Sequence, residues 1–298
     1  MPKPIAIFFA GCNGAGKSTL RDDILKSKYP FIDADFIAKQ VNFSHLPNAD
    51  IAAGREAIRR FRYYLQEKQS FSIETTLSGV GALNNMRKAK NAGFEVHLYY
   101  CALASVELNI ARVADRVAMG GHNIAENTIR RRYVESLQNL KTAMELADKY
   151  DIFDNSQRNK QHELCVVKDK NNIYINQLPK WLVPYLPQNI IDIHTLSERV
   201  IQAKETYKTL AKTLNGQDKV RLKMYQDTVT QTIAQEKDPN QKQVAWLHFY
   251  QYVAERIKDG KLNLPKPIPI EQAQQMIKQL TQTQTQSQTI QTPKKHKR

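Results

Sequence analysis

The sequence predicts an α/β protein with a parallel sheet, followed by a helical extension and a low-complexity tail. A continuous apolar run rich in branched and aromatic residues covers residues 5–10, which is typical of a strand buried on both faces of a sheet. Similar runs at residues 70–73 and 94–103 each follow a helical pattern, at residues 53–67 and 81–92. Strands that alternate with helices form βαβ units, so we expect the three runs to pair in parallel.

The remaining sequence predicts where the sheet ends and a second part begins. Helical patterning continues over residues 105–147, and a short strand at 152–153 is followed by a hairpin over 163–167 and 172–175. A proline cluster at positions 179, 184 and 187 then marks a boundary, because proline disfavours helix at the residue before it. We therefore expect a first domain over residues 1–180.

Two different segments follow the boundary. Residues 190–260 read as a small helical extension with apolar residues at helical spacing. Residues 261–298 contain three early prolines, a Thr-Gln repeat and a basic end, with almost nothing to bury. We predict that this last segment is a disordered basic tail.

Cysteine usage and hydrophobicity predict a soluble cytoplasmic protein. The chain has 298 residues and three cysteines, Cys12, Cys101 and Cys165, which are widely spaced and outside any CxxC or metal-ligand pattern. They fit reduced thiols, so we expect neither a disulfide nor zinc. The apolar run near the start is too short to cross a bilayer, and no membrane partner is expected.

The net charge does not decide which class of partner the protein binds. The formal net charge of +15 would attract polyanions, which include nucleic acid, acidic surfaces and nucleotides. Nucleic acid stays open as a partner through the basic tail, although the charge alone does not favour it.

The first motif with specific chemistry follows the first predicted strand directly. Residues 11–18 fit G-x-x-x-x-G-K-[ST] between a strand and a helical stretch. Glycines let successive backbone N–H groups point at phosphates, Lys17 would bridge the β- and γ-phosphates, and the Ser18 hydroxyl would hold Mg²⁺. ATP is the expected nucleotide, since no motif for reading guanine is present. The predicted nucleotide-binding residues are Gly11, Cys12, Asn13, Gly14, Ala15, Gly16, Lys17, Ser18 and Thr19.

Carboxylates at two strand ends could act on an acceptor. Asp35 ends the short apolar segment 31–35, where it would serve as a base or alternatively cap the following helix. Glu74 follows a buried run, at the edge of a parallel sheet where ligands bind, although a structural hydrogen bond would also explain it. Glu56 lies in a charged helical stretch and on its own resembles a solvated surface acid.

Arginines after residue 105 predict a helical lid. Arg112 and Arg116 are four residues apart on one helical face, and three further arginines occupy positions 130–132. In small kinases, such helix–loop–helix lids carry arginines that stabilise the transferring phosphoryl group and exclude water. The alternative for each is a surface arginine bound to solvent or to a nearby acid.

Together these ordered motifs resemble the zeta toxins, which are P-loop kinases of toxin–antitoxin systems and their bacterial relatives. The resemblance spans roughly residues 5–163 and is far more specific than the phosphate loop alone. Its segments are residues 11–19, 32–35, 54–56, 73–77, 111–124, 131–133 and 153–156.

The resemblance implies a reaction and a set of roles. The fold would be a P-loop kinase core with a helical lid, and the reaction would phosphorylate the 3′-hydroxyl of the sugar in UDP-N-acetylglucosamine. Asp35 would accept the proton of that hydroxyl, and Arg112 would stabilise the phosphoryl group. An antitoxin protein is the implied partner. The positions implied to face the acceptor are Glu56, Glu74, Thr75 and Thr76.

One departure leaves the acceptor open. Where the best-known toxins carry a second lid arginine, this chain has Gly120-Gly121-His122, so Arg116, His122 or Arg131 would have to replace it. A kinase for another acceptor, such as a nucleic-acid 5′-hydroxyl, and a nucleotide-binding regulatory module therefore remain as alternatives.

Overall fold

The computed structural model describes residues 2–25, 28–40, 49–158, 160–170, 172–260 and 262. The chain forms two compact units, Met1–Ile191 and Asp192–Arg298, and their division falls just after the proline cluster. The predicted tail over residues 261–298 lies, apart from Leu262, outside the described residues.

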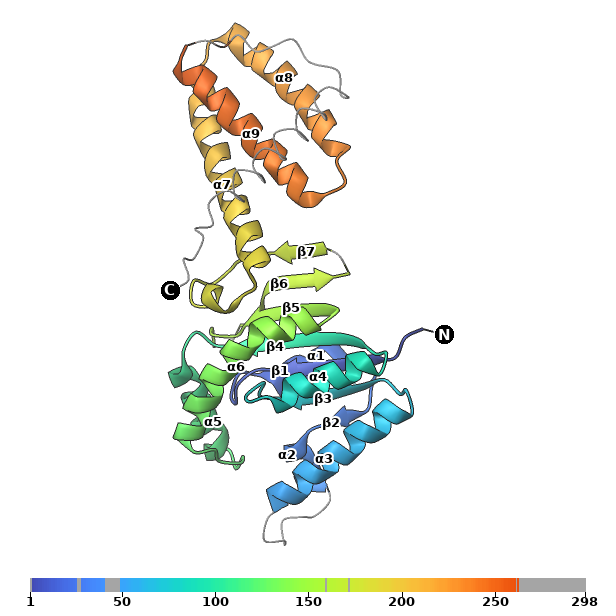
Figure 1. The fold of residues 1–298 in the computed structure, drawn as a ribbon. Helices are drawn as coiled ribbons and strands as arrows, with labels where there is room; N and C mark the ends of the chain where they lie inside the picture. The colour runs from blue at the N-terminus through green and yellow to red at the C-terminus, as the bar shows by residue number, and fades with distance from the viewer. Residues whose placement is uncertain are drawn as a thin grey trace, which may run out of the picture. The chain divides into compact units, whose positions relative to one another are not determined.

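The first unit is built on one sheet of seven strands in the order β2-β3-β1-β4-β5-β6-β7 (Figure 1). The pairs from β2 to β5 are parallel, and β6 and β7 add to the edge as an antiparallel hairpin. This confirms the predicted α/β class with a mostly parallel sheet. The strands are β1 (Ile5–Ala10), β2 (Phe31–Ile32), β3 (Phe71–Thr75), β4 (Glu95–Ala102), β5 (Lys149–Asp154), β6 (Glu163–Asp169) and β7 (Asn172–Ile175).

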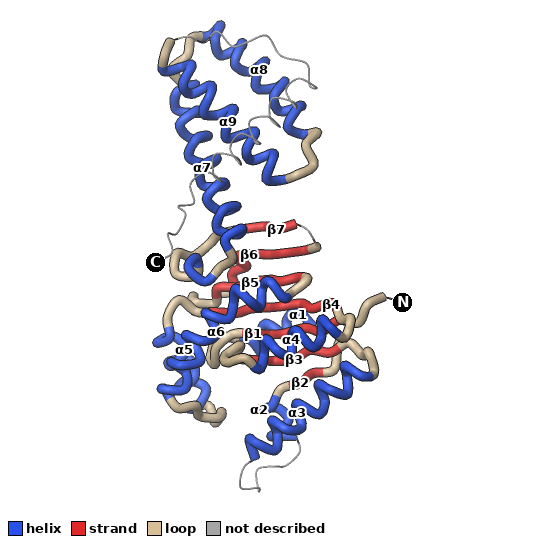
Figure 2. The backbone as a smooth tube through the Cα atoms, viewed as in Figure 1, coloured by secondary structure: helices blue, strands red, loops and turns tan. Residues whose placement is uncertain are grey.

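Helices flank this sheet, with α4 and α6 packed on each other in front of the strands and α1 behind them (Figure 2). The crossovers of the parallel strands supply these helices, as the alternating sequence pattern predicts. The helices of the first unit are α1 (Lys17–Leu25), α2 (Ala34–Gln40), α3 (Ala49–Gln66), α4 (Gly81–Asn91), α5 (Val106–Ala118), α6 (Glu126–Leu146) and the short 3-10 helix η2 (Val183–Tyr185).

The central strand β1 is buried because it pairs with β3 on one side and β4 on the other. Phe8 joins the main core cluster, while Phe9 stacks on Tyr99 of β4 with ring centroids 5.1 Å apart. Burial of such side chains contributes roughly 1.5–3 kcal/mol each. A rigid centre of the sheet therefore supports the loop that follows β1.

The parallel arrangement brings the carboxyl ends of β1, β2 and β3 to the same edge of the sheet. Phe9 pairs with Glu74 in register, so this acid lies in the last part of β3 rather than after it. The chain after β1 forms the glycine loop, and the amide of Gly11 donates to the carbonyl of Thr75 at 3.2 Å. These strand ends position the site described below.

The region predicted to be helical forms three helices, α7 (Gln188–Ala211), α8 (Gly216–Ala234) and α9 (Pro239–Lys258). The second unit contains α8, α9 and all of α7 from residue 192 onward. Its core is aromatic, with Tyr207 of α7 against Phe249 and Tyr250 of α9 at 5.6 and 5.3 Å between ring centroids. Asn215 caps α8 by accepting from the amide of Asp218 at 2.9 Å. Among the described residues, no helix combines the length and hydrophobicity needed to cross a bilayer.

Candidate active site

The loop after β1 has the backbone that phosphate binding requires. Gly14 and Gly16 have φ values of 77° and 98°, in the region that glycine tolerates best. A side chain at Gly16 would also meet Asn155 and His162, which lie directly against it. Only glycine therefore fits position 16, and the loop continues into α1 at Lys17.

Side chains from elsewhere in the chain hold this loop from outside. Asn155, after β5, donates from Nδ2 to the carbonyl of Ala15 at 2.8 Å. Asn109 of α5 donates to the carbonyl of Asn13 at 2.6 Å, and Arg132 of α6 donates to Asn13 Oδ1 at 3.0 Å. Sequence reasoning did not assign these supporting residues. The only signal was that Arg132 and Asn155 lie in segments 131–133 and 153–156, which resemble the zeta toxins.

The loop lines one side of a cavity of about 570 Å³. Residues from the strand ends and from the helical lid complete its wall, so segments more than 100 positions apart meet here. Its lining residues are Asn13, Gly14, Gly16, Lys17, Ser18, Thr19, Arg21, Asp33, Asp35, Phe36, Ala38, Glu74, Arg112, Arg116, Gly121 and His122.

At the loop end of the cavity, Glu74 contacts both residues that define the phosphate motif. The Lys17 ammonium lies 3.5 Å from Glu74 Oε1 and donates to the carbonyl of Cys12 at 3.1 Å. The Ser18 hydroxyl donates to Glu74 Oε2 at 3.0 Å. Lys17 is only 6 % exposed, so its charge is held in place without being fully hydrated. Glu74 thus faces the end of the glycine loop.

Two aspartates lie at the end of β2, and they have different local roles. Asp33 Oδ1 accepts from the amide of Asp35 at 2.9 Å, and the Asp33 carbonyl accepts from the amide of Ile37 at 2.9 Å. Asp33 is therefore the cap of α2, and Asp35, in its first turn, is not. Burial, followed by repulsion from Glu74 and Asp35, raises the pKa of Asp33. Both aspartates line the cavity, and the carboxylate of Asp35 is the one that does not cap the helix.

The lid contributes two cations from α5. Arg112 donates from Nη2 to the carbonyl of Asn155 at 2.6 Å, and burial lowers the pKa of its guanidinium, which nevertheless stays charged. Arg116 donates from Nη2 to the carbonyl of His122 at 2.8 Å, while its buried Nε has no hydrogen-bond partner among the described residues. Both arginines line the cavity that contains Lys17.

The glycine pair after α5 explains how Arg116 is held. The amide of Gly121 donates to the Arg116 carbonyl and that of Gly120 to the Val117 carbonyl, both at 2.9 Å. Gly120 has a φ of 84°, so the pair closes the helix as a Schellman motif. A Cβ on Gly121 would lie 2.6 Å from Arg116 Cγ. The segment that departs from the best-known toxins therefore shapes the surroundings of Arg116.

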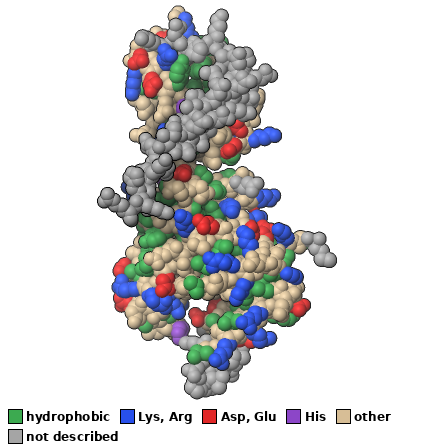
Figure 3. All heavy atoms as spheres, viewed as in Figure 1, with side chains coloured by type: hydrophobic (Ala, Val, Ile, Leu, Met, Phe, Trp, Pro, Cys, Tyr) green, Lys and Arg blue, Asp and Glu red, His purple; other side chains and the backbone are tan. Residues whose placement is uncertain are grey.

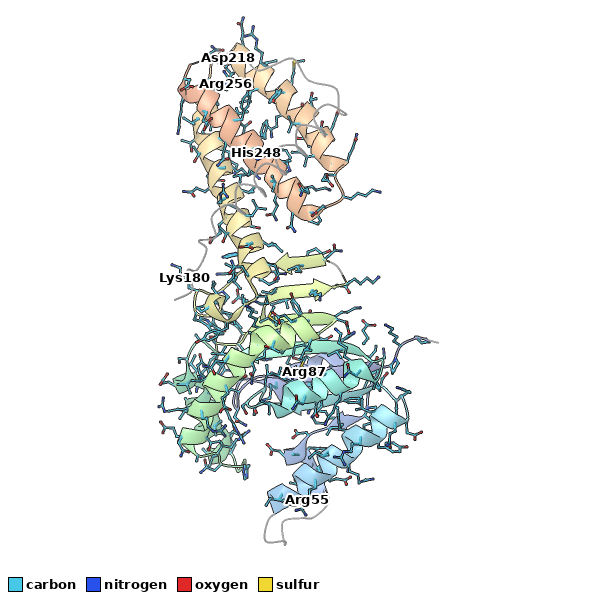
Figure 4. All side chains as sticks on the ribbon, viewed as in Figure 1. Arg55, Arg87, Lys180, Asp218, His248 and Arg256 are labelled. Atoms are coloured by element: carbon cyan, nitrogen blue, oxygen red, sulfur yellow. The ribbon has the colours of Figure 1, made fainter. Side chains whose placement is uncertain are left out.

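Several predicted residues do not line the cavity. Glu56 on α3 pairs with Arg59 at 2.7 Å and with Arg60 at 2.9 Å, and hydrogen bonds from these arginines lower its pKa to about 2. Arg55, labelled in Figure 4, lies on the same helix. The acceptor role of Glu56 remains a prediction. The other predicted residues outside the lining are Gly11, Cys12, Ala15, Thr75 and Thr76, and Arg131, a candidate lid cation, pairs with Glu135 instead.

The cavity also contains residues that sequence reasoning did not assign. Arg21 of α1 lies 3.7 Å from Glu74 Oε2, and its guanidinium is 4.0 Å from the centroid of the Phe31 ring. Arg21 follows Ser18 by three residues, and residues with this spacing lie on the same face of a helix. This spacing could have predicted that Arg21 lies near the site. Phe36 is 45 % exposed despite its apolar ring. It provides an apolar part of the wall beside Asp35.

Parts of the chain are similar to known proteins. A sequence model of the Zeta toxin family matches residues 1–178. An uncharacterised protein of Haemophilus influenzae strain Rd is 45 % identical over 128 residues, which are 43 % of this chain and 91 % of that protein.

Two solved structures show weaker similarity. The first belongs to the PezAT chromosomal toxin–antitoxin system of Streptococcus pneumoniae, with 22 % identity over 54 % of this chain and 70 % of that chain, at a TM-score of 0.43. The second, an AvrRxo1-ORF1:-ORF2 complex with ATP, has 13 % identity over 58 % of this chain at a TM-score of 0.46, and the match spans 60 % of that chain.

The family match covers more than half of the chain and includes every residue that lines the cavity. It therefore rests on the part of the molecule where the phosphate loop, the strand-end acids and the lid arginines meet. The chain belongs to the Zeta toxin family, a family of kinase-type toxins.

Proposed function

We propose that the protein transfers the γ-phosphate of ATP to a hydroxyl of a small acceptor, and that UDP-N-acetylglucosamine is this acceptor. The observation that carries the proposal is the meeting of Lys17, Asp35 and Arg112 around one cavity. These are a cation for the phosphates, an acid for the hydroxyl and a cation for the developing charge. The acceptor follows from family membership and the resemblance of the motifs.

The phosphate end fits ATP and Mg²⁺. Loop glycines with positive φ let backbone amides face the phosphates, and Lys17 is already at the cavity wall. Ser18 and Glu74 bring a hydroxyl and a carboxylate within 3.0 Å of each other, and oxygen donors of this kind suit Mg²⁺. Ser18 would hold the ion, which when bound neutralises charge on the phosphates. Glu74 would orient the Ser18 hydroxyl.

The acceptor end is the part of the cavity around Asp35. Asp35 would accept the proton of the attacking hydroxyl, while Arg112 and Arg116 of the lid would stabilise the charge that develops on the phosphoryl oxygens. Thr75, Thr76 and Glu56 keep their implied acceptor roles as part of the proposal. An antitoxin partner is part of the proposal, and family membership supports it. Action in the cytoplasm is also part of the proposal, and the three widely spaced cysteines are the argument for it.

A direct test incubates the purified chain with ATP, Mg²⁺ and UDP-N-acetylglucosamine, and then follows the acceptor by mass spectrometry. We expect the sugar nucleotide to gain one phosphoryl group, and fragmentation should locate that group on the sugar rather than on the uridine. Parallel reactions contain uridine diphosphate or a 5′-hydroxyl oligonucleotide instead. Phosphorylation of the oligonucleotide alone would replace the proposed acceptor with a nucleic acid.

Replacing Glu74 with glutamine tests whether this residue acts at the phosphate end. Because its carboxylate contacts Lys17 and Ser18, Glu74→Gln should lower phosphoryl transfer and the slow background hydrolysis of ATP together, each by about tenfold or more. Steady-state kinetics with and without acceptor separate the two rates. A raised acceptor KM with unchanged background hydrolysis would instead restore the predicted role of Glu74 in acceptor binding.

Adding one methyl group at Gly121 tests the position of Arg116. The new Cβ would overlap Arg116, so Gly121→Ala should lower kcat about tenfold through misplacement of a phosphate-binding cation. Gly81→Ala is the matched control, because a Cβ there meets nothing within 4 Å. Thermal unfolding of both variants reports any loss of fold. Equal kcat values for the two variants would remove Arg116 from the proposed machinery.

A further inference from the structure

A groove between α7 and α8 in the second unit carries four lysines around an apolar floor. The groove has a volume of about 400 Å³, and its floor includes Tyr207 and Leu222, both buried. The surface of this unit lies beyond residue 178, where the match to the Zeta toxin family ends. The lysines are Lys208, Lys212, Lys219 and Lys223, and all four are exposed.

The four lysines form two pairs at helical spacing. Lys208 lies in the last turn of α7 and Lys212 follows four residues later, in the turn just after this helix, while Lys219 and Lys223 are four residues apart on α8. Residues with this spacing lie on one side of a helix, about 6 Å apart along its axis. The two helices are joined by the Tyr207 hydroxyl, which donates to Gln226 Oε1 at 2.8 Å. One lysine pair therefore lies at the end of α7 and in the turn after it, the other lies on α8, and both line one groove.

Neighbouring acids leave most of this charge unpaired. Glu205 pairs with Lys208 at 2.8 Å, whereas Asp218, labelled in Figure 4, pairs with Arg221 at 3.7 Å. Within the described part of the chain, Lys212, Lys219 and Lys223 form no ion pair. Like charges gathered in this way repel one another, so a ligand with negative charge would stabilise the groove.

The composition of the second unit does not account for the cluster. Apart from these four lysines, residues 192–260 contain seven lysines and arginines and nine acids. Elsewhere, positive charge is mixed with acidic side chains, as it is on the sheet-containing unit in Figure 3. The groove is therefore a local concentration of positive charge in a nearly balanced unit.

We propose that this groove binds an acidic amphipathic helix of a partner protein. An amphipathic helix would place apolar side chains on the floor, and its acids at a spacing of four residues would match the lysine pairs. A nucleic-acid backbone would satisfy the lysines but leave the apolar floor uncovered. Among the described residues of the groove it would also find no exposed ring for base stacking, since Tyr207 is only 7 % exposed.

The composition of residues 261–298 does not match such a segment. Residues 261–298 contain one acid, Glu271, against seven lysines and arginines. Like charge therefore disfavours this segment as the occupant, which points to a separate acidic partner.

The test measures the binding of a designed helix to the full-length chain by fluorescence anisotropy. The probe is a synthetic peptide of about 20 residues with leucines along one face and flanking glutamates, and its control is a scrambled peptide of the same composition. A single-stranded oligothymidylate tests binding of a nucleic-acid backbone. We expect the designed helix to bind about tenfold or more tightly than the scrambled peptide.

Charge reversal locates the binding site. The combined variant Lys212→Glu, Lys219→Glu and Lys223→Glu should weaken binding of the designed helix about tenfold or more. The matched control makes the same three charge changes outside the groove, at Lys237, Lys242 and Lys258, and should change binding less than about threefold. Lysine-to-glutamine changes at the three groove positions should give an intermediate loss of affinity for the designed helix. This variant replaces the charge-reversal variant if that one does not fold.

Four results would overturn the proposal. Equal binding of the designed and scrambled peptides would indicate attraction of any polyanion, and tighter binding of oligothymidylate that depends on the groove lysines would indicate a nucleic-acid site. Unchanged peptide affinity in the reversal variant would place the peptide elsewhere. Sedimentation showing a dimer that the reversal variant abolishes would make a second copy of this chain the occupant.

Discussion

Lys17→Ala is expected to lower phosphoryl transfer by on the order of a thousandfold or more. Its ammonium lies at the cavity wall, 3.5 Å from Glu74, and would contact the β- and γ-phosphates when ATP is bound. No other lysine of the described residues lines the cavity. The remaining loop amides can still shape a phosphate site, but they cannot replace a full positive charge at this position.

Transfer to the acceptor is measured with radiolabelled ATP, and circular dichroism checks that the variant is folded. Lys88→Ala on α4 serves as the control, because this lysine is exposed and does not line the cavity. Near wild-type turnover in a folded Lys17→Ala protein would contradict the kinase proposal as a whole.

Asp35→Asn is expected to slow transfer about a hundredfold or more while ATP binding persists. Asparagine keeps the size of the side chain, and the amide of residue 35 can still donate to Asp33 Oδ1, so α2 should begin as before. What is lost is the capacity to accept the proton of the attacking hydroxyl. The loss should therefore appear in kcat and leave the affinity for ATP unchanged.

Titration calorimetry gives the ATP affinity of the variant, and single-turnover kinetics give the rate of transfer. Asp169→Asn is the matched control, because Asp169 is an exposed acid on β6 that does not line the cavity. A parallel loss of ATP affinity in Asp35→Asn would show that Asp35 acts on the nucleotide or its metal rather than on the acceptor.

Local sequence signals predicted most elements of the first unit, because each signal has a direct physical cause. The apolar run at β1 can only be satisfied by burial on both faces, and the glycine loop after it requires positive φ at Gly14 and Gly16. The hairpin of β6 and β7 was equally visible as two apolar runs separated by a polar turn. These features depend on residues close together in the chain.

The two aspartates at the end of β2 show where local signals become ambiguous. Either Asp33 or Asp35 could cap a helix, since both side chains can accept from backbone amides two or three residues later. The capping hypothesis for Asp35 was wrong, because α2 begins at Ala34 and Asp33 accepts the amide of Asp35. The choice depended on the point where β2 ends, which pairing with β3 sets.

The position of Glu74 shows a second kind of ambiguity. Its place at a sheet edge predicted a ligand-binding acid, but whether it faces the phosphates or the acceptor depends on the rotation of β3 relative to β1. The register that pairs Phe9 with Glu74 directs this carboxylate toward Lys17 and Ser18. Arg21 of α1 contacts Glu74 of β3 only because these two elements lie close together in space.

The sequence by itself determined the α/β class, the phosphate loop and the family, because these depend on local periodicity, backbone freedom and the order of motifs. The tertiary structure alone decided which charged side chains share a cavity, and it brought Arg116 and Asp35 to one wall while leaving Glu56 with Arg59 and Arg60. Such contacts join residues far apart in the chain, and their existence depends on strand register, helix ends and packing, which no short segment encodes.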